Sequence, residues 1–309
     1  MSMNDKNIDF LGKSKLAAGF SILLVVISIG SFFVRGMNLG LDFSGGTLIE
    51  VGYPQSAELN EVRSILADAG YQEAVVQHFG TSKDVLIKVA PRESLSSAEL
   101  SSDILRALKK SQDGVEVRRV EYVGPQIGDE LREDGGLALL FALIGILIYV
   151  ALRFEYRFAL GAVLALIHDV TITLGLFSVF QLEFDLTVLA AILAVIGYSL
   201  NDTIVVFDRI RENFRRIRKS TTLDVINQSL NQTLSRTLMT SFTTLLVVFA
   251  LFFFGGELIH GFATALMFGI IIGTYSSIYV ASALIQAMGV SKADLMPLEK
   301  EGANLDEMP

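Results

Sequence analysis

The sequence predicts an α-helical membrane protein with six transmembrane helices and an α+β domain outside the bilayer. Of its 309 residues, 51% are hydrophobic, and the mean hydropathy of +0.52 is higher than is usual for soluble domains. Several apolar runs approach the roughly 18–20 residues that cross a bilayer. Residues 35–135 instead alternate between strand-like and helix-like patterns. The predicted spans are residues 16–34, 136–152, 158–180, 186–207, 237–254 and 261–287.

The first span is predicted to be a retained anchor rather than a cleaved signal peptide. Lys6, Lys13 and Lys15 precede it, as basic residues precede both kinds of segment. Its apolar stretch is longer than the roughly 7–15 residues of a signal peptide, and no Ala-x-Ala cleavage pattern follows Val34. The chain has no cysteine, which excludes disulfides and thiol chemistry.

The basic residues of the short loops predict the orientation of the spans. Arg153 and Arg157 lie between the second and third spans. The loop after the fourth span contains Arg209, Arg211, Arg215, Arg216, Arg218 and Lys219. The opposite short loops, 181–186 and 255–261, contain no Lys or Arg. We therefore expect a cytoplasmic side that holds residues 1–15, a loop or interfacial helix at 208–236, and a tail at 288–309, with residues 35–135 outside.

Residues 35–135 are too long for an unstructured loop and are predicted to fold. Alternating β-rich residues predict strands at 46–54, 74–80, 83–90 and 114–124, with a turn at Thr81 and Ser82. Helical spacing predicts helices at 56–70 and 94–111. The order β-α-β-β-α-β is that of a ferredoxin-like split domain. Since that fold hosts many functions, both an independent small domain and a surface for a partner or substrate stay open.

The sequence does not indicate an enzyme. Gly12, Lys13 and Ser14 match the end of a phosphate-binding loop, but its first glycine would fall at Asn7. The three histidines have no metal-ligand spacing. We therefore expect no ATPase site, no metal, no cofactor and no nucleic-acid partner.

Asp202 is predicted to be a proton-carrying residue. It lies within the apolar run 186–207, where charged side chains are costly and normally face a bundle interior or a water path. Removal from water favours the protonated form of a carboxyl group, so a group reached from both sides in turn can carry protons. The alternative is a static, hydrogen-bonded group that packs helices together. The usual role of intramembrane acids favours the functional interpretation.

Arg236 is the predicted counter-charge of Asp202. It begins the fifth span on the expected cytoplasmic half, and helical spacing places Thr233, Thr240 and Thr243 on its face. We expect this polar stripe to point into the bundle. Arginine stays protonated, so Arg236 cannot carry the proton but can pair with Asp202 when that group is ionised. The alternative is an arginine at a helix end that extends to the membrane surface.

His168 and Asp169 form a second polar pair, near the middle of the third span. Because histidine titrates near neutral pH, the pair is a candidate extension of a proton path. It is equally a candidate for a satisfied pair that holds helices together.

The basic run 208–219 is predicted to fix the topology and to meet anionic membrane lipid. Asp208 and Arg209, at its start, are expected to cap the helix and to pair locally.

Five segments together resemble the SecF family, the smaller subunits of bacterial SecDF export complexes within the resistance-nodulation-division superfamily. They are GLDFSGGT at 40–47, VEYVGPQIGDEL at 120–131, the His168-Asp169 pair, GYSLNDTIVVFDRIREN at 197–213, and LNQTLSRTLMTSFTTLL at 230–246. Their order and spacing around six spans are specific. The family motif residues outside the polar pairs are Asp42, Gly45, Gly46, Gly124, Pro125, Gly128, Asn201, Asp208 and Arg209.

The resemblance implies a proton-driven role in late protein translocation across the bacterial inner membrane. It implies SecD as an obligate partner, the SecYEG channel and possibly YajC nearby, and a secreted polypeptide as substrate. It also implies that Asp202 and Arg236 match essential intramembrane positions, and that residues 35–135 form a periplasmic domain. Half of a small-molecule exporter and a purely structural translocon subunit are the alternatives.

Overall fold

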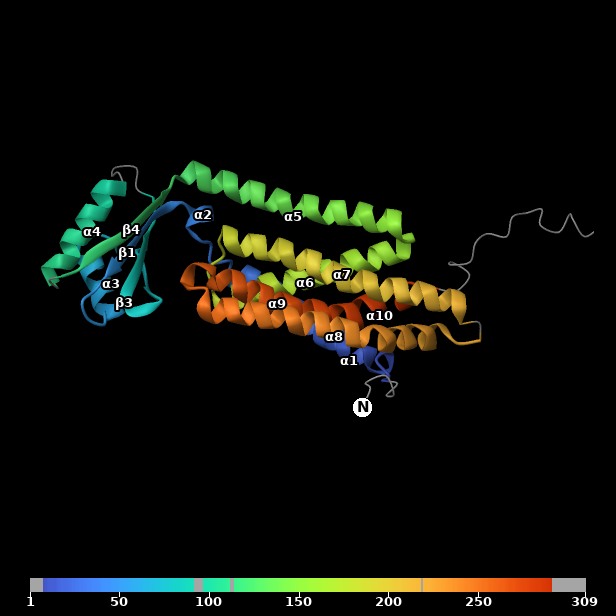
Figure 1. The fold of residues 1–309 in the computed structure, drawn as a ribbon. Helices are drawn as coiled ribbons and strands as arrows, with labels where there is room; N and C mark the ends of the chain where they lie inside the picture. The colour runs from blue at the N-terminus through green and yellow to red at the C-terminus, as the bar shows by residue number, and fades with distance from the viewer. Residues whose placement is uncertain (1–7, 92–96, 112–113, 218, 291–309) are drawn as a thin grey trace, which may run out of the picture.

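In the computed structural model of the chain, long apolar helices lie side by side and a small α+β unit stands at one end of them (Figure 1). The structure describes residues 8–91, 97–111, 114–217 and 219–290. Parts of the sequence prediction lie outside these residues: Lys6, positions 94–96, Arg218 and positions 291–309.

The described chain contains six helices long and apolar enough to cross a membrane, which confirms the predicted number of spans. They are α1 (Ser14–Val34), α5 (Pro125–Arg153), α6 (Tyr156–Phe180), α7 (Leu186–Arg216), α8 (Thr222–Phe254), and a last span that joins α9 (His260–Ser276), η4 (Ser277–Ala281) and α10 (Ser282–Ala287). Short 3-10 turns, η2 (Leu11–Lys13) and η3 (Glu257–Ile259), precede the first and the last span.

Three helices extend well beyond their apolar runs because polar residues cap or continue them. Pro125 opens α5 at a position that needs no backbone N–H. Thr221 and Asp224 form a reciprocal capping box at the start of α8. Hydropathy detects only the part of a helix that hydrocarbon surrounds, so the predicted spans are shorter than α5, α7 and α8.

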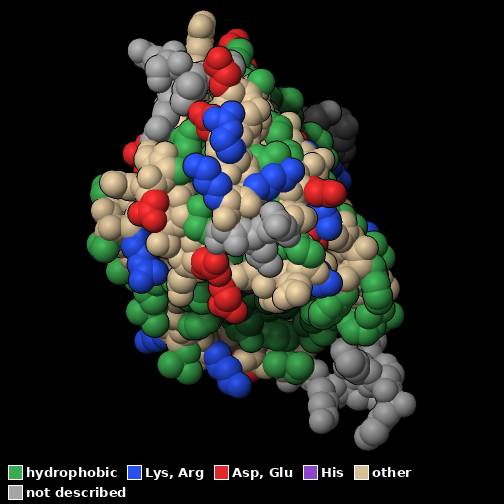
Figure 2. Space-filling model, turned by 90° about the vertical axis from the view of Figure 1, so that its left-hand side faces the viewer, with side chains coloured by type: hydrophobic (Ala, Val, Ile, Leu, Met, Phe, Trp, Pro, Cys, Tyr) green, Lys and Arg blue, Asp and Glu red, His purple; other side chains and the backbone are tan. Residues whose placement is uncertain are grey.

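The helices form an inner and an outer group. In α6, α7 and the last span, 50%, 50% and 61% of the apolar window is buried, against 11%, 11% and 17% in α1, α5 and α8. The outer helices therefore expose apolar side chains to lipid or to another protein. Seen from the end that carries the α+β unit, the molecule shows charged side chains of both signs, with hydrophobic side chains around them (Figure 2).

The α+β unit is a four-stranded antiparallel sheet in the order β2-β3-β1-β4. Its elements, in chain order, are α2 (Leu41–Ser44), β1 (Gly46–Gly52), α3 (Leu59–Asp68), β2 (Val75–Phe79), β3 (Thr81–Val89), α4 (Ser97–Ser111) and β4 (Glu116–Val123). The predicted strands and helices are all present. The turn expected at Thr81 and Ser82 is wrong, because Gly80 makes the connection with φ +71° and Thr81 already pairs with Phe79.

The sheet has a core on each face. On one face, Ile49 and Ile87 are fully buried with Leu66 of α3 and Ile104 of α4. The opposite face carries a smaller cluster of Leu41, Leu48 and Leu86. Loop residues that precede α7 and α9 line a cavity together with this second face. The second face of the unit is therefore turned toward the spanning helices.

Candidate functional site

Asp202 is buried in α7, with 3% of its surface exposed. Its Oδ2 atom is buried and accepts no hydrogen bond in the described structure. The same face of α7 buries Ser199, Thr203 and Val206, so the acid points into the bundle as predicted. A buried carboxylate without a partner is costly, and a bound proton removes its charge.

The predicted orientation of the Arg236 stripe is wrong. Thr233, Thr237 and Ser241 of α8 are buried, whereas Arg236 and Thr243 are exposed. Steps of four residues set the buried line, and Arg236 lies one residue, or about 100° of rotation, away from it. Arg236 is near enough to interact electrostatically with Asp202, but among the described ion pairs none joins these two side chains.

A chain of hydroxyl groups links α7, α8 and α9 one helical turn from Asp202. The Tyr198 hydroxyl donates to Ser241 Oγ over 3.1 Å, and Ser241 Oγ lies 2.6 Å from Thr274 Oγ1. Hydrogen bonds between spanning helices hold them in a fixed arrangement where lipid offers no alternative partner. These hydroxyls position the helices on either side of Asp202.

A second polar network surrounds Asp169, which is fully buried. One oxygen lies 2.8 Å from Nδ1 of His168, and the other accepts a hydrogen bond of 2.5 Å from Ser199 Oγ. Nε2 of His168 is buried and has no partner in the described structure. Ser199 precedes Asp202 by one helical turn. The two acids predicted from separate spans are therefore brought to one region of the bundle.

A π-helical turn, η4, lies beside this network. It begins at Ser277, directly after Ser276, whose side chain faces Asp169 from the last span. Isolated π turns inside α-helices are frequent at functional sites. Ser199, Ser276 and this turn were not predicted from the sequence. The one signal near them is a run of hydroxyl-bearing residues, Thr274–Ser277, inside an apolar span.

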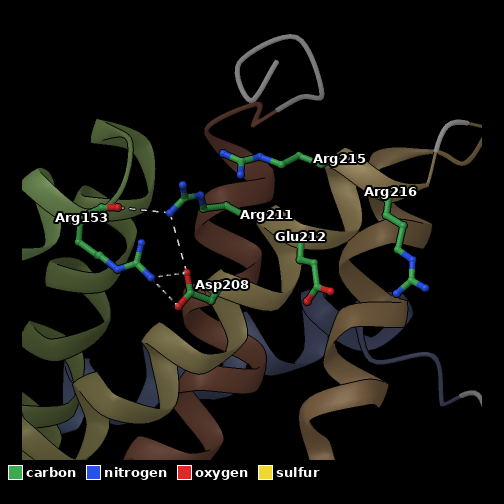
Figure 3. A pocket seen from close by; sticks show the side chains of 6 residues that line it. All are labelled: Arg153, Asp208, Arg211, Glu212, Arg215 and Arg216. Atoms are coloured by element: carbon green, nitrogen blue, oxygen red, sulfur yellow. Dashed lines mark hydrogen bonds and ion pairs between the residues drawn. The ribbon is translucent and has the colours of Figure 1, made fainter. Parts of the chain in front are cut away.

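The predicted basic run lies on the last turns of α7 and, with Arg153 of α5, lines an open cavity of about 550 Å³ (Figure 3), at the opposite end from the α+β unit. Asp208 is held there by Arg153 at 3.3 Å and Arg211 at 3.8 Å, and Arg209 pairs with Glu212 at 2.8 Å. The local pairing predicted for Asp208 and Arg209 is confirmed. Their predicted capping role is wrong, because α7 continues to Arg216.

The family motif residues near the α+β unit meet one another. Gly45 has φ +65°, and a Cβ atom there would lie 3.1 Å from Cα of Pro125. A Cβ atom at Gly128 would lie 3.0 Å from the backbone nitrogen of Gly45. Gly124 is the residue before α5, and Arg132 of α5 donates to the carbonyl of Phe43 over 2.7 Å. The GLDFSGGT and VEYVGPQIGDEL segments therefore pack together through their glycines.

The motif residue Asn201 is exposed on α7. Within the described residues, no group of three or more His, Cys, Asp or Glu side chains is placed to hold a metal ion.

Comparison with known proteins identifies the family. Residues 103–291 match the family described as "Protein export membrane protein SecD/SecF, C-terminal", and residues 30–57 match the "SecD/SecF GG Motif". The protein translocase subunit SecF of Vibrio alginolyticus is 56% identical, over 99% of this chain and 98% of the relative. That of Pseudomonas aeruginosa is 49% identical, over 100% of both.

A solved structure gives the same result. The crystal structure of SecDF, a translocon-associated membrane protein from Thermus thermophilus, is 41% identical with a TM-score of 0.85, covering 93% of this chain and 39% of that one. This chain thus spans about two fifths of that SecDF chain. It belongs to the SecD/SecF family of protein-export membrane proteins and, within that family, to the protein translocase subunits SecF.

Proposed function

We propose that this SecF subunit uses the proton-motive force to assist late steps of protein translocation, and that Asp202 carries the proton. The observation that supports this most is the buried, unpartnered carboxyl oxygen of Asp202 in a chain similar to SecF over its whole length. An ionised group in that position is unstable, and a neutral one is not. Asp202 is therefore stable when protonated, and each passage through the ionised form requires that one proton leaves and another arrives.

Arg236 supplies the charge that accompanies this cycle. Its guanidinium group is exposed on α8 in this subunit, although α8 is a membrane span. A permanent charge facing hydrocarbon is costly, so we expect a second protein to cover this face. SecD is the partner that the SecDF relatives indicate. The proton site is then complete only at the boundary between the two subunits.

His168 and Asp169 extend the path in this proposal. Asp169 is hydrogen-bonded to both His168 and Ser199, and Ser199 lies one turn from Asp202. A hydroxyl group both donates and accepts hydrogen bonds, so Ser199 is suited to stand between two acids.

The α+β unit is the part of the subunit placed outside the membrane. Its strand order and its helices on one face support a ferredoxin-like split fold. The Lys- and Arg-free loops lie at the end that carries this unit, and the arginine-rich cavity lies at the other. By the positive-inside rule, the arginine-rich end and both chain ends face the cytoplasm of a bacterial inner membrane. SecYEG, YajC and the secreted polypeptide are the further partners, and no ATPase site is assigned.

The proposal is tested with Asp202→Asn, which keeps the shape of the side chain and removes its titration. We expect protein export driven by the proton-motive force to be lost while assembly with SecD is retained. Glu212→Gln, exposed near the end of the same helix, is the matched control and should export normally. If Asp202→Asn also exports normally, the structural-subunit alternative is favoured. If the wild type transports small molecules and Asp202→Asn loses that transport, the exporter alternative is favoured.

A further inference from the structure

The segment before the glycine pair of the family motif also contacts the start of α7. Its backbone runs parallel to the loop before that helix, with a bridge between Leu39 and Phe184. The Gly40 N–H donates to the carbonyl of Phe184, and the Phe184 N–H donates to the carbonyl of Asn38, both over 2.8 Å. The rings of Phe43 and Phe184 stack at 5.6 Å. We call residues 38–44 and 181–184, with the backbone N–H of Leu186, the joint.

Asp42 completes the joint by capping α7 from outside that helix. The first N–H groups of a helix have no partner within it. Asp185, the residue before α7, accepts from the Val188 N–H over 2.8 Å. The Leu186 N–H is bound instead by Oδ2 of Asp42 over 3.0 Å. A carboxylate at this position also interacts favourably with the helix dipole.

The helix held in this way is the one that carries Asp202. α7 is continuous from Leu186 to Arg216, so a movement at Asp202 reaches Leu186 along an unbroken helix. On the other side, Asp42 belongs to α2, which β1 follows after a single residue, Gly45. Lys88 of β3 adds a hydrogen bond of 2.7 Å to the carbonyl of Leu39. The joint therefore lies on a continuous route of covalent and hydrogen bonds from Asp202, along α7, to strands β1 and β3.

We propose that Asp42 is the positioning residue that couples α7 to the α+β unit, and that the joint stays closed while the two move together. This inference rests on the proposed function, in which proton transfer at Asp202 moves α7. It assigns the aspartate of the glycine-pair motif a mechanical role. The glycines hold α2 close to α5, and the aspartate fastens α2 to α7.

The first test compares Asp42→Ala with Asp185→Ala in the assembled complex. Both remove a cap from the same end of α7, but only the first removes a direct contact between α2 and that helix. We expect Asp42→Ala to accelerate hydrogen exchange of the Leu186 amide at least about tenfold and to reduce proton-driven export severalfold. Asp185→Ala should leave export near the wild-type rate. Equal export by the two variants would overturn the proposal.

Asp42→Asn keeps the inference testable if the alanine variant fails to assemble. Its carboxamide oxygen accepts the same hydrogen bond, so exchange at Leu186 should stay within a few-fold of wild type and export should persist. An asparagine variant as impaired as the alanine variant would show that the charge serves another purpose.

A cross-link tests whether the joint stays closed. Asn38 Nδ2 donates to the carbonyl of Gln181 over 2.9 Å, and the chain has no native cysteine. The double variant Asn38→Cys with Gln181→Cys, treated with a bifunctional thiol reagent that spans both side chains, should cross-link and still export. Failure to cross-link, or loss of export only after cross-linking, would contradict a permanently closed joint. Normal export by Asp202→Asn would instead reject the proposed function, while exchange at Leu186 and cross-linking yield still report on the joint.

Discussion

Replacing Gly46 by alanine should destabilise the α+β unit more than the same replacement at a positive-φ glycine with open space around it. Gly46 begins β1 with φ +123°, and a Cβ atom there would lie 2.4 Å from the carbonyl oxygen of Val89. That oxygen belongs to the backbone of the paired strand β3, so the clash cannot be relieved by a side-chain rotation. Gly70, with φ +88° and no atom within 4 Å of its Cβ position, is the matched control.

The magnitude follows from two contributions. A residue with a Cβ atom in a conformation that only glycine adopts easily costs about 1–3 kcal/mol. Both variants have this cost. Gly46→Ala adds an overpacking cost of about 1–3 kcal/mol, because β1 and β3 must move apart. We therefore expect Gly46→Ala to lower the free energy of unfolding by about 2 kcal/mol more than Gly70→Ala.

Hydrogen exchange of the β1 and β3 amides in the assembled complex measures this difference. Because about 1.4 kcal/mol corresponds to a factor of ten, the amides should exchange about thirtyfold faster in Gly46→Ala than in Gly70→Ala. Equal exchange in the two variants would refute the clash with Val89 and, with it, the reason given for the second glycine of the motif.

Three further outcomes are expected. Burial, with a smaller contribution from the charge of Glu61, raises the pKa of Tyr53 to about 12 in the folded chain. The tyrosine of the unfolded chain therefore ionises at a lower pH, and the free energy of unfolding of the α+β unit should fall by about 2–3 kcal/mol between pH 10 and 12. Denaturation at pH 9 and 11 should show about half of this loss, roughly 1.3 kcal/mol, in wild type and not in Tyr53→Phe. Burial raises the pKa of Glu183 by more than the nearby charge of Lys88 lowers it. The stability of the wild type should therefore fall relative to that of Glu183→Gln as the pH rises above 4.5, and thermal unfolding at several pH values measures this difference. Replacing Arg215 and Arg216 by glutamine should weaken retention of anionic lipid about fivefold per residue in native mass spectrometry, with no change for neutral lipid.

Much of the fold was predictable from the sequence because hydropathy and strand alternation are strong, local signals. The six spans and the strand and helix order of the α+β unit are confirmed. The helix ends were not predictable in the same way. α7 continues to Arg216 and α8 begins at Thr222, because helix formation outside the membrane depends on capping and propensity rather than on an apolar run.

The candidate site was predictable only in its charged members. Asp202 and Asp169 stand out because acids are rare in apolar spans, and both are buried. The direction of Arg236 was wrong because a rotation of one residue separates the buried and exposed faces of a helix. Ser199 and Ser276 were missed because serine is common in spanning helices, and only the packing of α6, α7 and α9 brings them to Asp169. The contact of Asp42 with Leu186 joins positions 144 residues apart, which no local pattern encodes.

The central claim is that Asp202 transfers the protons that drive export. The most direct measurement is the export rate of a secretory polypeptide in vesicles that contain the complete complex, with and without an imposed proton gradient. The gradient should accelerate export by the wild type and have no effect on Asp202→Asn, with equal amounts of assembled complex in both. An equal acceleration in the variant would contradict the claim.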